Sequence, residues 1–291
     1  YSFIFGAMFG DVGQGLVLFL GGLFLYKTKK MDLAGIISCA GVFSVFFGFM
    51  YGSFFGFEDV LKAIWLKPMN QMMDVPLVGR LNAVFVIAIG FGMFIILICM
   101  VFNIINSIRR GDTEKTWFDS NAVAGLVFYG SIVLTIGLFI SGKKLPAAAI
   151  LVIMFGVPLL LMFLKEPLTN LVEKKSKILP EQKGMFFVQS FFELFEVLLS
   201  YLSNTLSFLR IGAFAVSHAA MMEVVLMLAG ATNGGSPNWV VVVLGNIFVC
   251  AMEGLIVGIQ VLRLEYYEIF SRFYAGNGRE FKPFMKAAHK N

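Results

Sequence analysis

A single arginine stands in the middle of a long hydrophobic stretch near the C-terminus of this 291-residue chain. Arg210 lies within residues 186–230, and its nearest charged neighbours along the sequence are Glu196 and Glu223, roughly 20 Å away on either side in a helix. A guanidinium at the bilayer centre costs about 2.5 to 3.5 kcal/mol on insertion scales, so we expect it to face protein or water. Its counter-ion must come from outside this helix. Such a group is typical of proteins that move ions.

Small hydroxyls and one histidine share the helix that carries this arginine. Ser203, Ser207 and Ser217 follow helical spacing with Arg210, so they line the same face. This face is expected to be narrow, partly wet and opposed to another polar surface. His218 stands eight residues beyond Arg210. A lone histidine is more often a satisfied polar group than a proton carrier, but this position makes it a candidate for the ion path.

A second hydrophobic stretch, residues 238–274, also contains polar groups. Glu253 and Gln260 are seven residues apart and share one helix stripe; Arg263 and Glu268 follow as further candidate channel-lining groups. A carboxylate, an amide and a guanidinium along one face are typical of an ion pathway or a fixed charge network. The alternative is that Glu253 and Arg263 only pair with neighbouring helices. The acids near Arg263 keep this alternative open.

The composition places these groups in a membrane. The chain is 58% hydrophobic and only 14% charged, with a mean hydropathy of +0.84, and a helix needs about 20 apolar residues to cross the hydrocarbon core. Charge-free runs that can hold such helices occur at residues 12–26, 33–57, 81–108, 120–142, 145–164 and 224–252. A turn signal at residues 233–237 divides the last run. The sequence predicts an all-α polytopic transmembrane protein of about eight helices, with two long tilted helices at the C-terminal end.

The sequence lacks the residues that other classes of function need. Cys39, Cys99 and Cys250 lie far apart inside apolar runs, so neither a disulfide framework nor a zinc site with the two histidines is expected. The glycines of residues 9–15 lie in an apolar helical context that does not suit a nucleotide-binding loop. We expect no catalytic activity, no cofactor and no metal in the chain itself. The net charge of +5 indicates topology rather than binding to nucleic acid.

The distribution of lysine and arginine predicts the orientation. If the loop at residues 27–30 is cytoplasmic, alternation places sixteen basic residues on the cytoplasmic side and five on the other side, as the positive-inside rule requires. We therefore expect N-terminal scaffold helices at residues 1–164 and a cytoplasmic basic loop at 165–185. Long tilted helices that form the ion-translocation interface are expected at 186–274, and a cytoplasmic C-terminal tail at 275–291.

Two arrangements fit the first 26 residues. They form either two spans that turn near Gly10 and Asp11, or one kinked helix. The chain opens at Tyr1 directly into apolar sequence, without the charged start of a signal peptide. We expect it to be a fragment of a longer protein.

Three motifs resemble one known family. FGDVGQG at residues 9–15, SNTLSFLRIGAFAVSHAAM at 203–221 and EGLIVGIQVLRLEYYEIFSRFYAGNGREFKPF at 253–284 are similar to the membrane domain of subunit a of V-type and A-type rotary ATPases, called subunit I in bacteria and archaea. The resemblance implies a stator subunit in a prokaryotic plasma membrane, whose last two helices face a rotating ring of proteolipid c subunits. A preceding cytoplasmic domain would tie it to the peripheral stalks and the soluble ATPase sector.

The resemblance also implies roles for individual residues. Arg210 matches the essential arginine that faces the ring, and Arg263 matches the second arginine of the last helix. Glu253 and His218 match positions associated with the ion path, whereas Gln260 stands where eukaryotic members have histidine, so a detailed proton relay does not transfer. A permanently protonated guanidinium can attract a rotor carboxylate, promote ion release and block a leak between half-channels. The sequence selects neither H⁺ nor Na⁺, and neither pumping nor ATP synthesis.

Two other functions fit parts of the sequence. A stand-alone secondary ion transporter is the main alternative, but such carriers usually show internal repeats with matched broken helices. Here the polar groups are confined to the last two hydrophobic segments. A membrane scaffold without a pathway is the third interpretation, and it predicts that Arg210→Gln is tolerated.

Overall fold

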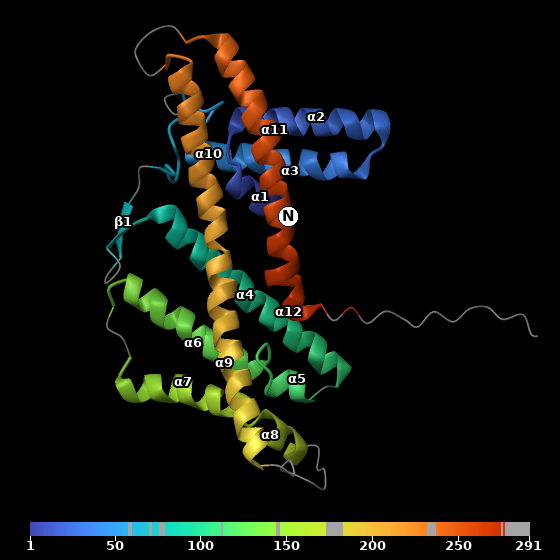
Figure 1. Cartoon of the computed structure of the whole chain (residues 1–291), viewed down its shortest axis with the longest axis vertical. Coiled ribbons are helices and arrows are strands. Elements are labelled where there is room, and N and C mark those ends of the chain that lie inside the picture. The colour runs from blue at the N-terminus through green and yellow to red at the C-terminus, as the bar shows by residue number, and fades with distance from the viewer. Residues whose placement is uncertain are drawn as a thin grey trace, which may run out of the picture.

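Helices make up almost all of the structure (Figure 1). The computed structural model describes every residue except 58–59, 70–71, 76–78, 112, 144–145, 173–182, 232–236, 275 and 277–291. The helices before residue 173 are Ser2–Met8 (α1), Val12–Lys29 (α2), Asp32–Tyr51 (α3), Ala83–Arg110 (α4), Thr113–Trp117 (α5), Val123–Ile140 (α6), Ala148–Phe163 (α7) and Lys165–Val172 (α8). The later helices are Lys183–Ser207 (α9), Leu209–Leu228 (α10), Trp239–Leu264 (α11) and Ser271–Phe273 (α12).

Two smaller elements complete the described chain. A π-helical turn, Glu265–Phe270, joins α11 to α12. Strands β1 (Met72–Val75) and β2 (Gly79–Asn82) form an antiparallel hairpin before α4.

Among the described residues, five stretches of helix are long and apolar enough to cross a membrane. They are α3, α4, α6, the 45-residue run Gly184–Leu228 formed by α9 and α10, and the 35-residue run Trp239–Phe273. The pair α7 and α8, which meet at 72°, would be a sixth span. The all-α polytopic fold expected from the sequence is confirmed, including the two long C-terminal helices.

The first 26 residues form two helices rather than one. The break lies at Phe9–Asp11, where Asp11 caps α2 by accepting a hydrogen bond from the backbone N–H of Gln14. Of the two arrangements that fit the sequence, the structure therefore has the turn near Gly10 and Asp11.

Helices α2 and α3 pack backbone against backbone through glycines. A Cβ atom at Gly41 would lie 2.5 Å from the backbone nitrogen of Phe19, and one at Gly48 would lie 2.4 Å from that of Val12. Only glycine allows so close an approach, which is a common device between membrane helices. The hairpin of α2 and α3 is consequently closely packed, and α1 packs against α3.

The two long helices lie across the shorter ones. In Figure 1, α9 and α10 run along the longest axis with α11 beside α10, while α2, α3, α4, α6 and α7 cross this pair at steep angles. Helix α1 contacts α3, α10 and α11, and α4 contacts α9, α10 and α12. If the shorter helices follow the membrane normal, the long pair is strongly tilted, as the sequence predicts.

Two of the expected segments fall partly outside the described residues. In the predicted basic loop at 165–185, α8 occupies the beginning and α9 starts at Lys183, whereas residues 173–182 lie outside the description. Of the predicted tail at 275–291, only Gly276 is described.

Candidate functional site

Arg210 lies in the first turn of α10, just after the break from α9 at Phe208. Its side chain is partly exposed, and its Nη1 lies 3.5 Å from the backbone oxygen of Gln260 on α11. This distance exceeds the usual range for a hydrogen bond. Within the described part of the chain Arg210 makes no ion pair; Glu268 is the acid near enough to interact with its charge.

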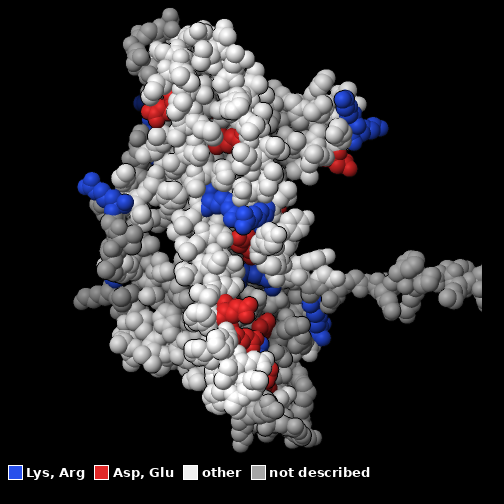
Figure 2. Space-filling view, viewed as in Figure 1, with Lys and Arg blue, Asp and Glu red and all other residues white. Residues whose placement is uncertain are grey.

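Arg263 and Gln260 lie on the neighbouring stretch of α11. Arg263 is exposed and Gln260 is half-buried. The Arg210 guanidinium approaches the backbone oxygen of Gln260, and Arg263 follows Gln260 by three residues, so both predicted arginines belong to one region of the long helix pair. Figure 2 shows a basic patch half-way along this face, with acidic side chains on either side of it.

The predicted hydroxyl groups are open to the surroundings of the protein. Ser203 and Ser217 are exposed, and Ser207 is partly exposed. The Ser207 hydroxyl donates to the carbonyl oxygen of Ser203 at 3.0 Å. The face that carries Arg210 is therefore polar and uncovered within the described chain.

His218 and Glu253 form a buried pair between α10 and α11. Nδ1 of His218 lies 2.6 Å from Oε2 of Glu253, and their side chains are 4% and 3% exposed. The ring of Phe9 packs against the imidazole, with centroids 4.7 Å apart. Nε2 of His218 and Oε1 of Glu253 have no hydrogen-bond partner among the described residues. Buried polar atoms are rarely left unpaired, so water would be stabilised at both atoms.

A cavity of about 20 Å³ lies beside this pair. It has room for about one water molecule. Its walls come from the α1–α2 turn, α10 and the segment after α3, and they consist of Gly10, Tyr51, Ser53, Gly56, Pro68, Ala215, His218, Ala219 and Met222. The space beside the pair is therefore a narrow cavity rather than an open channel.

Two buried polar residues next to this cavity were not predicted from the sequence. Asp11 is 0% exposed and Gln14 is 1% exposed. Nε2 of Gln14 donates to Oδ1 of Asn246 on α11 at 2.8 Å. The signal was present in the FGDVGQG motif, because two strongly polar residues three positions apart in an apolar stretch need buried partners.

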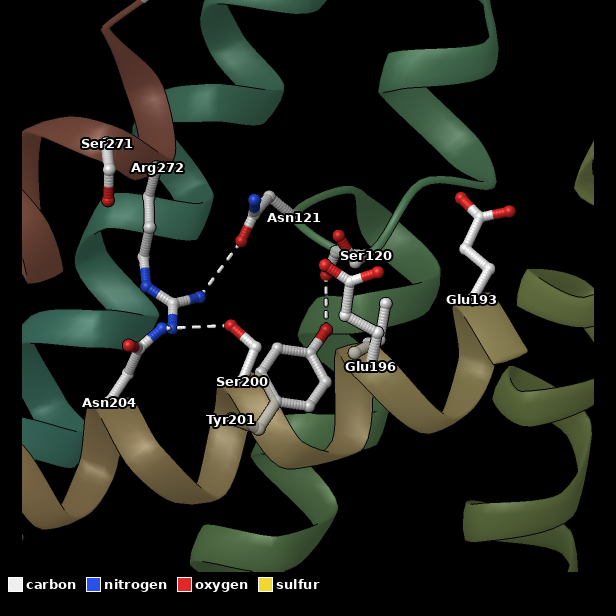
Figure 3. A pocket seen from close by; sticks show the side chains of 10 residues that line it. Ser120, Asn121, Glu193, Glu196, Ser200, Tyr201, Asn204, Ser271 and Arg272 are labelled. Atoms are coloured by element: carbon white, nitrogen blue, oxygen red, sulfur yellow. Dashed lines mark hydrogen bonds between the residues drawn. The ribbon is translucent and has the colours of Figure 1, made fainter. Parts of the chain in front are cut away.

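A larger polar cavity of about 350 Å³ lies between α9, α12 and the segment after α5 (Figure 3). Its polar lining consists of Ser120, Asn121, Glu193, Glu196, Ser200, Tyr201, Asn204, Ser271 and Arg272. Figure 3 shows the Tyr201 hydroxyl directed at the backbone oxygen of Ser120, to which it donates a hydrogen bond. Water fits such a space readily.

Arg272 is the buried cation of this larger cavity. It is 7% exposed, its Nη1 donates to Oδ1 of Asn121 at 2.9 Å, and its guanidinium lies 5.8 Å from the centre of the Tyr201 ring. Its Nε and Nη2 atoms have no partner among the described residues. Arg272 was not predicted from the sequence, because nothing in a charge count separates a buried arginine from the basic tail that follows it.

Glu268 lies on the π-helical turn between α11 and α12. It is 5% exposed, and within the described chain its Oε2 has no hydrogen-bond partner. π-Helical turns often occur at functional sites, because they shift the side chains that follow by one position. The predicted Glu268 is therefore buried, and it is near enough to Arg210 and Arg272 to interact with both charges.

The two polar sites lie on opposite sides of Arg210 along the long helix. Glu196 precedes Arg210 by fourteen residues and His218 follows it by eight, or about 21 Å and 12 Å of helix. In the part of the chain that the structure describes, no three His, Cys, Asp or Glu side chains are placed to hold a metal ion. Fold and site together define a polytopic membrane protein with ionisable groups buried between two long helices, which is typical of ion pathways.

Comparison with known proteins shows which family the chain resembles. Residues 169–286 match the V-type ATPase 116kDa subunit family. The chain is 27% identical over 320 residues to the A-type ATP synthase subunit I of Aeropyrum pernix, a match that covers 96% of this chain and 45% of that protein. It is also 27% identical over 304 residues to the subunit I of Pyrococcus horikoshii, with 98% and 41% covered. The chain is thus similar to this family over nearly all of its length, and the resemblance predicted from its motifs is confirmed.

The identity is higher over a shorter stretch. Over 100 residues the chain is 41% identical to the A-type ATP synthase subunit I of Saccharolobus solfataricus, covering 31% of this chain and 14% of that protein. The chain spans less than half the length of the curated relatives that it matches over nearly all of its own length.

Proposed function

We propose that the chain is the stator membrane part of an ion-translocating rotary ATPase, in which Arg210 separates two half-channels. The observation that supports this most strongly is the guanidinium itself. It is partly exposed on a hydrophobic helix pair, lies between two polar sites, and makes no ion pair within the described chain. A charge in that position is stabilised by a counter-ion on a partner that contacts this face.

The proposed partner is a ring of proteolipid c subunits whose carboxylates pass Arg210 one after another. An approaching carboxylate would release its ion into one half-channel, pass the guanidinium in the charged form, and reload from the other half-channel. Because arginine keeps its proton, the fixed positive charge also prevents ions from crossing directly between the half-channels. The exposed Arg263 would support this charge from α11.

The two polar sites would supply the half-channels. With the orientation given by the positive-inside rule, the cavity around Arg272 lies toward the cytoplasm and the His218–Glu253 pair lies toward the outside. Gln260 and Glu268 lie on α11 and its π-helical turn, between these sites and Arg210. The steep tilt of the long helices suits a surface that follows the curve of a ring.

The remaining parts of the complex would lie outside this chain. A preceding cytoplasmic region would connect it to the peripheral stalks and to the soluble sector that hydrolyses or makes ATP, and the membrane would be a prokaryotic plasma membrane. The chain itself would hydrolyse nothing. Its contribution would be positioning and electrostatics, with H⁺ or Na⁺ as the transported ion.

The test is to replace Arg210 in the complete complex reconstituted into vesicles. We expect Arg210→Ala and Arg210→Gln to lower ATP-driven ion uptake by at least about 100-fold while the complex still assembles, because the guanidinium acts only when the ring turns. Arg210→Lys should retain a small fraction of uptake. Arg109→Ala is the control, because Arg109 is an exposed arginine at the end of α4.

Two outcomes would contradict the proposal. Uptake by Arg210→Gln at the rate of the unchanged protein would indicate a scaffold without a pathway. Ion flux through the purified chain alone, without a proteolipid ring, would indicate a stand-alone secondary transporter.

A further inference from the structure

The short turn between α1 and α2 carries a buried carboxylate that the proposed pathway does not use. Asp11 is 0% exposed, and its oxygens accept hydrogen bonds from four groups. The backbone N–H of Gln14 donates at 2.9 Å and the hydroxyl of Ser53 at 2.7 Å. The backbone N–H groups of Phe55 and Gly56 donate at 3.1 Å and 3.0 Å. The two oxygens of a carboxyl group have enough acceptor sites for all four donors.

Three of these donors belong to the segment that follows α3, and this segment forms one wall of the small cavity beside His218. Ser53 and Gly56 line that cavity. Gly56 has φ +82° and packs directly on Met222, because a Cβ atom there would lie 2.6 Å from the methionine methyl group. Met222 lies one turn after His218 on α10. Asp11 therefore holds the wall of the cavity against the helix that carries the histidine.

The same turn also contacts α11, which carries the acid of the pair. Nε2 of Gln14 donates to Oδ1 of Asn246 at 2.8 Å, and Asn246 shares a helix stripe with Glu253 seven residues later. On the other side of the turn, the Phe9 ring packs on the imidazole of His218. Residues 9–14 thus contact both helices of the pair, and Asp11 fixes their place in the fold.

We propose that Asp11 is a positioning residue for ion entry from the outer side. Its carboxylate holds the 53–56 segment as the wall of the narrow cavity, and it keeps the α1–α2 turn between the helices that carry His218 and Glu253. The inference rests on the proposed function, because it assigns this cavity to the outer half-channel. Loss of the carboxylate should loosen the wall without removing any group that the ion itself meets.

The first experiment separates positioning from simple loss of folded protein. The complete complex is assayed for gradient-driven ATP synthesis in vesicles, with external H⁺ or external Na⁺ varied at a fixed membrane potential. For Asp11→Asn we expect the external ion concentration at half-maximal synthesis to rise about fivefold while the maximal rate per assembled complex stays within about twofold, since binding and turnover are separable. Ser53→Ala, which removes one donor and leaves the charge, should give a smaller rise in the same direction.

A matched variant controls for the loss of a carboxylate. Asp32 is an exposed acid in the first turn of α3, and Asp32→Asn should change neither quantity. A lower maximal rate with an unchanged half-saturating concentration in both Asp11→Asn and Ser53→Ala would overturn the proposal. So would failure of Asp11→Asn to assemble, since that result would make the residue a requirement for folding alone.

The second experiment does not depend on transport. Ala219 lines the cavity, and a cysteine introduced by Ala219→Cys can be labelled from the outside with a small charged thiol reagent. We expect the labelling rate to rise about tenfold when Asp11→Asn is added, because thiol reactivity follows access. An equal rate would overturn the proposal, and since labelling needs no rotation, this result remains interpretable even if the role proposed for Arg210 fails.

Discussion

The two polar sites on either side of Arg210 differ in size and in redundancy. The site around His218 and Glu253 has a cavity of about 20 Å³ and one hydrogen-bonded pair, whereas the site around Arg272 has a cavity of about 350 Å³ lined by several acids, amides and hydroxyls. A narrow site depends on each of its groups, because one water and one pair leave no alternative route. A wide site can lose a group and still hold water. We therefore expect substitutions at the site around His218 to have larger effects than substitutions at the site around Arg272.

Packing explains the difference. Near His218, α10 and α11 pack together and α1 lies against both, so little space is left between them. In Figure 1, α9 extends past the end of α12. The segment with Ser120 and Asn121 borders the larger cavity there, which none of the described helices fills. The narrow site thus lies where α1 packs against both long helices.

The largest effect is expected at the narrow site. Glu253→Leu should abolish ATP-driven ion uptake and destabilise the complex by about 1 to 3 kcal/mol, because it leaves the buried imidazole of His218 without its hydrogen-bond partner. The double variant His218→Leu with Glu253→Leu should recover most of the thermal stability but none of the uptake. Thermal unfolding of the detergent-solubilised complex and vesicle uptake measure the two quantities. Transport by the double variant would show that ions do not pass this pair.

An intermediate effect is expected for Arg272. Arg272→Gln removes the bond to Asn121 and the contact with the Tyr201 ring, and we expect uptake per assembled complex to fall about three- to tenfold. Arg272→Lys should recover part of the loss, since it keeps the charge without the planar fork. Initial rates of ATP-driven uptake provide the measurement. Full activity of Arg272→Gln would mean that the larger cavity needs no fixed cation.

The smallest effect is expected for an acid of the larger cavity. Glu196 is exposed, and Glu193, Ser200 and Asn204 line the same space. Glu196→Gln should therefore lower uptake by less than about twofold, as for most changes at surface positions. The same vesicle assay measures it. A loss as large as that of Glu253→Leu would remove the proposed difference between the sites.

Part of the candidate site was predicted from the sequence. Arg210 is isolated in a hydrophobic run, and Glu253 and Gln260 share a stripe by their spacing alone, because helical periodicity is a local property. The direct pair between His218 and Glu253 was not predicted, since these residues are 35 positions apart on different helices. Arg272 was missed for a related reason, because its burial depends on Tyr201 and Asn121 from distant segments.

The sequence by itself determined that the chain forms membrane helices, where its two long C-terminal helices lie, and that Arg210 has no acid within reach on its own helix. These properties follow from hydrophobicity and helical period, which act over neighbouring residues. Only the tertiary structure decided which polar groups meet. The pairing of His218 with Glu253 and the enclosure of Asp11 depend on the relative height and rotation of helices, and close glycine contacts between distant segments help to set both.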